Sequence, residues 1–289
     1  FQADFSADEI HEPYFALNIR NADIHGGLVA RVLNHDKVTV MAPRAVKTLR
    51  VDQARVVIET DQDAVSGALV IGADGRDSTV RGFAGIGVET VDYQQMAITC
   101  MVSHPRAHDN RSVEFHRPGG PFTLVPLSGN RSSVVWMERT VRGRDILALS
   151  PDDFQSALQH ETQGVLGAVT VLDKPQSWPL VWQRAEKIIA PRVALVAEAA
   201  HALPPSGAQG LNLSLQDVAT LASVLIRAHR CGMDLGSGAT LATYARLRTG
   251  AMHAKTNAVD GLNRMIMTAH PALRRLRRAG LFAASTLPL

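Results

Sequence analysis

The chain has 289 residues, 46% of them hydrophobic and 20% charged, which suits a globular protein of one large domain or two ordinary ones. Its formal net charge is only +3, and this balance argues against a nucleic-acid-binding protein. Two cysteines without a CxxC spacing argue against a metal site or a disulfide framework. No apolar stretch approaches the roughly 18 residues that span a bilayer, so we expect a cytoplasmic protein.

Strand patterns begin after Pro43. Residues 54–60 and 67–71 flank a polar turn and are predicted to be strands. The second pattern runs into GADGRDSTVR, residues 72–81, where Ser78 is placed to cap a short helix. This segment therefore predicts a strand, a tight turn and a helix in succession.

An antiparallel sheet is expected next. The patterns predict successive strands without intervening helices at residues 93–103, 112–116, 122–127 and 132–138. The sequence SGNR between the last two strands is typical of a hairpin turn. Ser150 then caps a helix that runs to about His160, because Pro151 suits the first helical turn and two acids follow it.

Strand and helix alternate again in the last third of the chain. A strand is predicted at residues 192–197, and helices are predicted at 209–230, 242–267 and 271–284. This order predicts a mixed α/β fold, in which an antiparallel-sheet domain interrupts a Rossmann-like nucleotide-binding domain.

Two motifs carry candidate chemistry. In GADG, two glycines allow a tight turn, and Asp74 follows a strand at the edge where open α/β sheets bind ligands. The alternative for this motif is an ordinary strand-to-helix turn.

The second motif, VALVAEAAHALPPSGAQGLN at residues 193–212, joins an apolar strand to an acid, Glu198, and a stiff loop before a helix. The carboxylate can bind sugar-like hydroxyls, the prolines stiffen the loop, and the glycines let a flat ligand approach the backbone. The helix N-terminus favours an anionic ring. The alternative is a structural loop whose buried acid is satisfied by a cap.

Together the motifs resemble the second and third fingerprints, GADGxxSxxR and GDAAHxxPPxGAxGLN, of the FAD-dependent aromatic-ring hydroxylases, the 4-hydroxybenzoate hydroxylase family. Asp217 falls where the family has an Asp in the following helix. The WPLVW run at residues 178–182 and the C-terminal GLNRMI and HPALRRLRRAGL sequences resemble the ubiquinone-biosynthesis branch, whose members include 2-polyprenyl-6-methoxyphenol hydroxylase-like enzymes.

The resemblance implies a monooxygenase in which NAD(P)H reduces FAD and O₂ supplies the oxygen placed on a phenolic ring. The cofactor supplies the chemistry, so no catalytic side chain is expected. The implied domains are a partial FAD-binding domain at 1–88, a substrate domain at 89–188, a second FAD-binding part at 189–255 and a helical segment at 256–289.

The resemblance also implies cofactor contacts for six residues of the second motif: Glu198, Pro205, Gly207, Gly210, Leu211 and Asn212. The acid would hold the ribityl chain, the loop would pass beside the isoalloxazine, and the last two residues would offer backbone N–H groups to the ring. Pro205 would also face the substrate.

Five other residues have two interpretations each. Asp74 would lie near the pyrophosphate and the NAD(P)H approach. Arg81 would fix that loop or form a surface ion pair. His201 is either a structural hydrogen-bonding residue or a catalytic one. Trp178 and Trp182 either line the substrate pocket or belong to the core.

The chain departs from the family at two places. Ala197-Glu198 replaces the family's Gly-Asp, which predicts weaker or shifted flavin binding. No GxGxxG is present, and Gly26-Gly27 lacks its spacing. The chain begins FQADFSADEI, without an initiator Met or the features of a signal peptide. We therefore expect the N-terminal βαβ unit to be missing from this chain, and weak or no FAD binding without it.

The C-terminal helix is basic and apolar, with Arg274, Arg275, Arg277 and Arg278 next to leucines and a phenylalanine. It would contact an anionic membrane surface at the inner membrane, or form a solvated face or a protein contact. Two alternatives to the leading function stay open: hydroxylation of a small soluble phenol, and a flavin-free scaffold subunit. The expected partners are a hydrophobic phenolic substrate and further copies of the chain or a biosynthetic complex.

Overall fold

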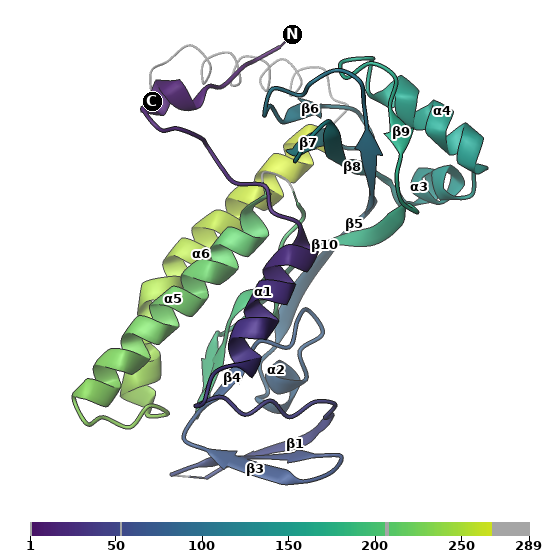
Figure 1. Ribbon diagram of the computed structural model, residues 1–289. Helices are drawn as coiled ribbons and strands as arrows, with labels where there is room; N and C mark the ends of the chain where they lie inside the picture. The colour runs from purple at the N-terminus through teal and green to yellow at the C-terminus, as the bar shows by residue number, and fades with distance from the viewer. Residues whose placement is uncertain (1, 53, 206–207, 268–289) are drawn as a thin grey trace. The chain divides into compact units, whose positions relative to one another are not determined.

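The chain folds into two compact units, which Figure 1 shows as a ribbon. The computed structural model describes residues 2–52, 54–205 and 208–267. The first unit contains residues 1–40, 94–179 and 264 onwards, and the second contains residues 41–93 and 180–263. Among the described residues, no helix combines the length and the hydropathy that crossing a membrane requires.

An antiparallel sheet forms the centre of the first unit, and three of its strands, consecutive in the chain, form a meander. Its strands are adjacent in the order β5 (Val88–Ser103, from residue 94 on in this unit), β8 (Arg131–Arg139), β7 (Phe122–Leu127) and β6 (Val113–Phe115). The short β9 (Thr170–Val171) pairs with the end of β5. Because side chains alternate between the two faces of a sheet, the register places Ile98, Trp136 and Phe122 side by side on one face.

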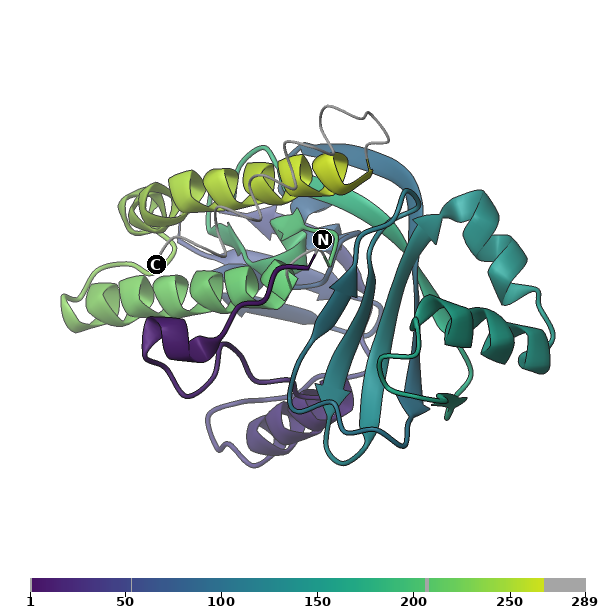
Figure 2. The same ribbon diagram turned by 90° about the horizontal axis from the view of Figure 1, so that it is seen from above.

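The helices that lie wholly in this unit are η1 (Ala7–Ile10), α1 (Asn21–Leu33), α3 (Thr140–Leu147) and α4 (Pro151–Glu161). Two of them, α3 and α4, cover that face of the sheet. Ile146 of α3 and Phe154 and Leu158 of α4 are buried in one cluster with the strand residues. Figure 2 shows these two teal helices on one side of the strands. Burial of this apolar cluster stabilises the unit.

The second unit contains two small sheets. The first consists of β1 (Val46–Val51), β2 (Val56–Thr60) and β3 (Ala64–Gly67), all antiparallel. In the second, β12 (Val193–Leu195) lies between β11 (Ile189–Ala190), antiparallel to it, and β4 (Val70–Gly72), parallel to it. The remaining strands are β10 (Gln176–Ala185, from residue 180 on in this unit) and its partner β13 (His201–Ala202).

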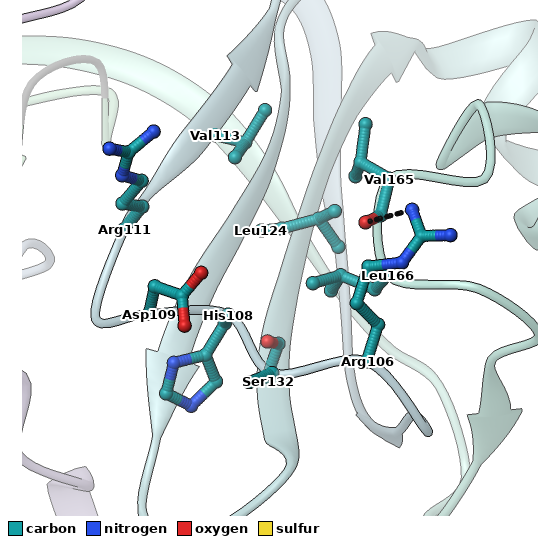
Figure 3. A pocket seen from close by; sticks show the side chains of 10 residues that line it. Arg106, His108, Asp109, Arg111, Val113, Leu124, Ser132, Val165 and Leu166 are labelled. Carbon is teal, nitrogen blue, oxygen red and sulfur yellow. Dashed lines mark hydrogen bonds between the residues drawn. The ribbon is translucent and has the colours of Figure 1, made fainter.

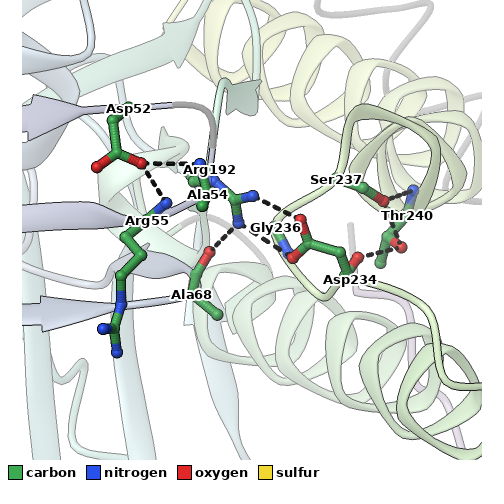
Figure 4. Close-up of polar contacts among 9 residues, drawn as sticks. All are labelled: Asp52, Ala54, Arg55, Ala68, Arg192, Asp234, Gly236, Ser237 and Thr240. Atoms are coloured by element: carbon green, nitrogen blue, oxygen red, sulfur yellow. Dashed lines mark hydrogen bonds and ion pairs between the residues drawn. The ribbon is translucent and has the colours of Figure 1, made fainter.

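Helices α2 (Thr79–Phe83), η2 (Ala197–Ala199), α5 (Gln209–Arg230) and α6 (from Gly238, within Gly238–Met267) complete the second unit. Helices α5 and α6 run side by side (Figure 1). Arg192, at the start of β12, donates to Asp234 Oδ1 at 3.0 Å and to Ala68 O at 2.8 Å, and Asp234 accepts from Gly236 N (Figure 4). This cluster fixes the loop before α6 to the sheet.

Most predicted elements are confirmed. Helix α5 has the predicted bounds, and Ser78 and Ser150 accept the capping hydrogen bonds of α2 and α4. The predicted strand at 67–71 is wrong: the chain leaves β3 at Gly67 and enters another sheet at Val70, because Val70 N bonds to Arg192 O. The predicted strand at 192–197 ends earlier, at Leu195, because a turn follows.

Among the described α-helices, α1 and α3 were not predicted, and α6 begins four residues early. Helix α1 has no buried residue and α3 has two, Gly143 and Ile146, so neither carries a strong apolar periodicity. The predicted helix at 271–284 lies outside the described residues. The predicted domain bounds stay a prediction.

Candidate functional site

The two motifs meet at one edge of the second unit. Strand β12 is completely buried and pairs in parallel with β4, with Val193 opposite Val70 and Leu195 opposite Gly72. Parallel strands present their carboxyl ends at the same edge of a sheet, so the loops that follow β4 and β12 lie together. Val196 N donates to Gly72 O at 3.0 Å, which continues the pairing into the loops.

Each glycine of the GADG turn occupies a position where a Cβ would be unfavourable. A Cβ on Gly72 would lie 2.8 Å from Leu195 Cδ2, so the glycine allows close packing against β12. Gly75 has a φ of +84°, in the left-handed region that favours glycine. The Asp74 carboxylate accepts from Ser78 Oγ at 2.5 Å and from Val80 N at 3.0 Å. Asp74 therefore fixes the turn to the start of α2, and its cofactor role stays a prediction.

Arg81 connects the two motifs. Its side chain is buried, and it donates from Nη1 to Ala199 O at 3.0 Å and from Nη2 to Arg76 O at 2.9 Å. Of its two interpretations, the structure supports the fixing of the loop rather than a surface ion pair. Both acceptors are backbone carbonyls, so the guanidinium holds the backbone of both loops in place.

Glu198 lies in the turn η2 immediately after β12. Its side chain is exposed, and no hydrogen bond or ion pair joins it to another described residue. The preceding Ala197 has a φ of +55° in the left-handed region, at the position where the family has glycine. An L-residue with a Cβ costs roughly 1–2 kcal/mol in this conformation. The turn is therefore strained at the residue that precedes the candidate ligand-binding acid.

Asp217 of α5 fixes this turn from inside the protein. Its Oδ2 accepts from Ala197 N at 3.1 Å and from His201 Nε2 at 2.6 Å. Its Oδ1 accepts from Arg248 Nε at 2.8 Å and Nη2 at 2.7 Å. Asp217, His201 and Arg248 are each at most 5% exposed as whole residues. His201 is thus a structural hydrogen-bonding residue that donates to a carboxylate.

Arg248 was not predicted to be a site residue. No local motif surrounds it, yet it occupies a position in the buried stripe of α6 formed by Leu241, Tyr244 and Met252. A charge on the apolar stripe of a helix must have a buried partner, because an unpaired buried charge is costly. That periodicity could have predicted a buried ion pair, although not its partner.

The N-cap residue of α5 does not cap the helix with its side chain. Ala208 is the N-cap with a φ of +50° and makes no capping hydrogen bond with its side chain. A Cβ on Gly210 would meet no atom within 4 Å in the described part of the chain, its own helix backbone and chain neighbours aside. Leu211 and Asn212 are exposed in the first turn, and Pro205 is exposed at the end of the preceding described segment. Gly207 lies outside the described residues.

The two tryptophans differ in their surroundings. Trp182 is buried in the second unit, donates from Nε1 to Thr256 O at 3.1 Å and stacks 4.9 Å from the Arg184 guanidinium. It belongs to the core, one of its two interpretations. Trp178, in the first unit, is 59% exposed and is available to a ligand.

The first unit also contains a cavity of about 170 Å³ under the loop that precedes β6 (Figure 3). Leu124 and Leu166 contribute apolar lining, and Arg106 at its edge donates to Val165 O at 3.1 Å. None of the residues in the two motifs lines this cavity.

The family match and the similar proteins agree on one family. The chain matches the FAD binding domain family over residues 36–283. It is 37% identical over 270 residues to ubiquinone hydroxylase UbiL of Rhodospirillum rubrum, covering 93% of this chain and 63% of that protein. It is 30% identical over 281 residues to 3-demethoxyubiquinol 3-hydroxylase of Escherichia coli, covering 97% of this chain and 72% of that protein.

Solved structures show the same fold. The structure of p-nitrophenol 4-monooxygenase PnpA from Pseudomonas putida has a TM-score of 0.74 at 21% identity, covering 91% of this chain and 68% of that one. Klebsiella pneumoniae HpxO, complexed with FAD and uric acid, has a TM-score of 0.74 at 19% identity, covering 91% of this chain and 67% of that one.

The chain spans about two thirds of the length of these proteins, and 63% of the first relative. The family match covers most of the chain, and the motifs that follow β4 and β12 meet at one sheet edge. The chain belongs to the family of FAD-dependent aromatic-ring hydroxylases, in the branch that contains the ubiquinone hydroxylases.

Proposed function

We propose that this chain is the greater part of an FAD-dependent monooxygenase that hydroxylates the aromatic ring of a polyprenylated phenol in ubiquinone biosynthesis, with NAD(P)H and O₂. The observation that carries the proposal is the joining of the two motifs at one sheet edge by Arg81. The names of the two relatives support the substrate class.

The residues present fit FAD. The exposed Glu198 carboxylate has no partner among the described residues, so it is available to accept hydrogen bonds from ribityl hydroxyls. Among the described residues, no atom outside its own helix backbone and its chain neighbours lies within 4 Å of where a Cβ of Gly210 would be, which leaves room for a flat ring. The first turn of α5 has no side-chain cap, and a helix N-terminus stabilises an anion.

When bound, FAD supplies the electron transfer and the activation of oxygen. The chain's own residues would bind and orient it: Glu198 would hold the ribityl chain, while Leu211 and Asn212 would offer backbone N–H groups to the pyrimidine side of the ring. Asp74 and Arg81 hold the adjoining loop, and Pro205 would lie beside the ring. Trp178 is the tryptophan available to contact the phenol.

The decisive experiment uses the full-length protein with NAD(P)H, isotopically labelled O₂ and two phenols that differ only in the prenyl tail. Hydroxylated product that carries the label, with a higher kcat/KM for the prenylated phenol, supports the proposal. A preference for the phenol without a tail would favour a hydroxylase of small soluble phenols. A protein that binds no FAD would favour the scaffold subunit.

Contact with a membrane and assembly with other chains are further parts of this proposal. The basic residues at 274–278 lie outside the described residues, so their support comes from the sequence alone. Liposome flotation of the protein with and without residues 271–289 tests the membrane contact. Loss of flotation in the shortened protein supports a peripheral contact at the inner membrane, and equal flotation contradicts it.

A further inference from the structure

The turn that carries Glu198 is held at several points. Ala200 N bonds to Ala197 O at 2.9 Å, and Ala185 N bonds to Ala200 O at 2.8 Å. Arg81 holds Ala199 O at 3.0 Å. These bonds fix the turn after Glu198. The N–H of the strained Ala197, before Glu198, is bonded by Asp217 at 3.1 Å.

Asp217 is the common acceptor of the hydrogen bonds from Ala197, His201 and Arg248. It is 1% exposed, and a buried carboxylate is costly unless it is paired and hydrogen-bonded. The two contacts from Arg248 to Oδ1 neutralise the charge and leave Oδ2 to Ala197 and His201. A chain of direct contacts therefore runs from Arg248 through Asp217 to the backbone next to Glu198.

Two residues of helix α6, Tyr244 and Arg248, stabilise this region. Tyr244, one turn before Arg248, donates from its hydroxyl to Leu195 O at 2.9 Å, at the end of β12. Tyr244 is completely buried, and that burial raises the pKa of its phenol, so the group stays a protonated donor. The helix thus holds both the strand end and the carboxylate that fixes the turn.

We propose that Asp217 and Arg248 are positioning residues for flavin binding. They hold Ala197 in the left-handed conformation and so direct the Glu198 carboxylate outward, towards the ligand. The inference rests on the proposed function and deepens it, because neither residue touches the ligand itself. A purely structural ion pair would change only the stability of the protein and would leave the flavin affinity of the folded molecules unchanged.

The test compares Asp217→Asn and Arg248→Met with Arg246→Met in the full-length protein. Arg246 is a matched control, because it is exposed on the same helix two residues away. We expect Asp217→Asn and Arg248→Met to raise the Kd for FAD of the folded fraction about tenfold, the factor of one charge-assisted hydrogen bond. Visible circular dichroism of the bound flavin should change in these two variants and not in the control.

A second variant separates positioning from stability. Glycine adopts the left-handed conformation without a Cβ penalty, so Ala197→Gly should restore much of the FAD affinity lost in Asp217→Asn. Equal flavin affinity in Asp217→Asn and the Arg246→Met control, or no rescue by glycine, would overturn the inference.

Amide hydrogen exchange keeps the inference testable without flavin. In the unliganded protein, the amide of Ala197 should exchange faster in Asp217→Asn and in the milder Arg248→Lys than in Arg246→Met. Unchanged protection there overturns the inference. If the wild-type protein binds no FAD but the exchange changes as expected, the proposed function fails while the positioning of the turn stands.

Discussion

Arg81 donates a hydrogen bond to the carbonyl oxygen of Ala199, a residue 118 positions further along the chain. The bond joins the loop after β4 to the turn after β12, and the same guanidinium also holds Arg76 O in its own loop. Because the side chain is buried, its donors depend on these carbonyls rather than on water. The relative position of the two loops therefore depends on this side chain as well as on the β4–β12 pairing.

Replacing this side chain should be costly. Arg81→Met removes both hydrogen bonds and leaves two backbone carbonyls without this partner, which predicts a loss of about 3 kcal/mol in the free energy of unfolding. Urea unfolding measures it. The exposed Arg227→Met is the control and should change stability by less than about 0.5 kcal/mol. A similarly small change in Arg81→Met would contradict the role of the bond.

Ala197→Gly should stabilise the protein. Relief of the left-handed strain at φ +55° exceeds the added entropy of glycine in the unfolded chain, so we expect a gain of about 0.5–1 kcal/mol. Thermal unfolding checks the direction. The matched control is Ala194→Gly, in the buried strand β12, which should destabilise the protein instead. A loss of stability in both variants would show that Ala197 is unstrained.

The two cysteines should differ in reactivity. Burial, with a smaller contribution from the Asp173 charge, raises the pKa of Cys100 to about 12, whereas Cys231 is exposed. Because the thiolate is the reactive form, Cys100 should resist a thiol reagent at pH 8. We expect one fast-reacting thiol in the native protein and two after unfolding. In Cys231→Ser the fast phase should disappear, and its persistence would mean that Cys100 is accessible.

The pairing of Arg192 with Asp234 predicts a pH-dependent contribution to stability. The Arg192 hydrogen bond, followed by that from Gly236 N, holds the pKa of Asp234 below its usual value. A lowered pKa in the folded state means that this stabilisation is present at neutral pH and is lost as the pH falls through that pKa. Asp234→Asn should therefore be less stable than wild type at pH 7, with a smaller difference near pH 3. Urea unfolding at both pH values measures the two differences, and equal differences would contradict the prediction.

Local patterns predicted the elements that depend on neighbouring residues. The caps at Ser78 and Ser150 and the bounds of α5 follow from sequence spacing, because caps and apolar stripes act within a few residues. Helix α1 could not be found this way, since none of its residues is buried.

The candidate site was likewise only partly predictable from local sequence. The motif marked Glu198, but the left-handed conformation of Ala197 and its bond to Asp217 result from contacts between distant segments. Asp217 was recognised only by resemblance, and its partner Arg248 lies on another helix. Pairwise contacts of this kind carry no fixed spacing along the chain, so a sequence pattern cannot specify them.

The parallel pairing of Val70 with Val193 also bears on the order of folding. In the meander of the first unit, β6, β7 and β8 are neighbours along the chain and are joined by short loops, which close rapidly. The β4–β12 pair must close a loop of more than a hundred residues, an entropic cost that is met only when the rest of the second unit is in place. We therefore expect the flavin-facing turn to be among the last parts of this protein to form, so that a nascent or partly unfolded chain retains its meander while it is still unable to bind cofactor.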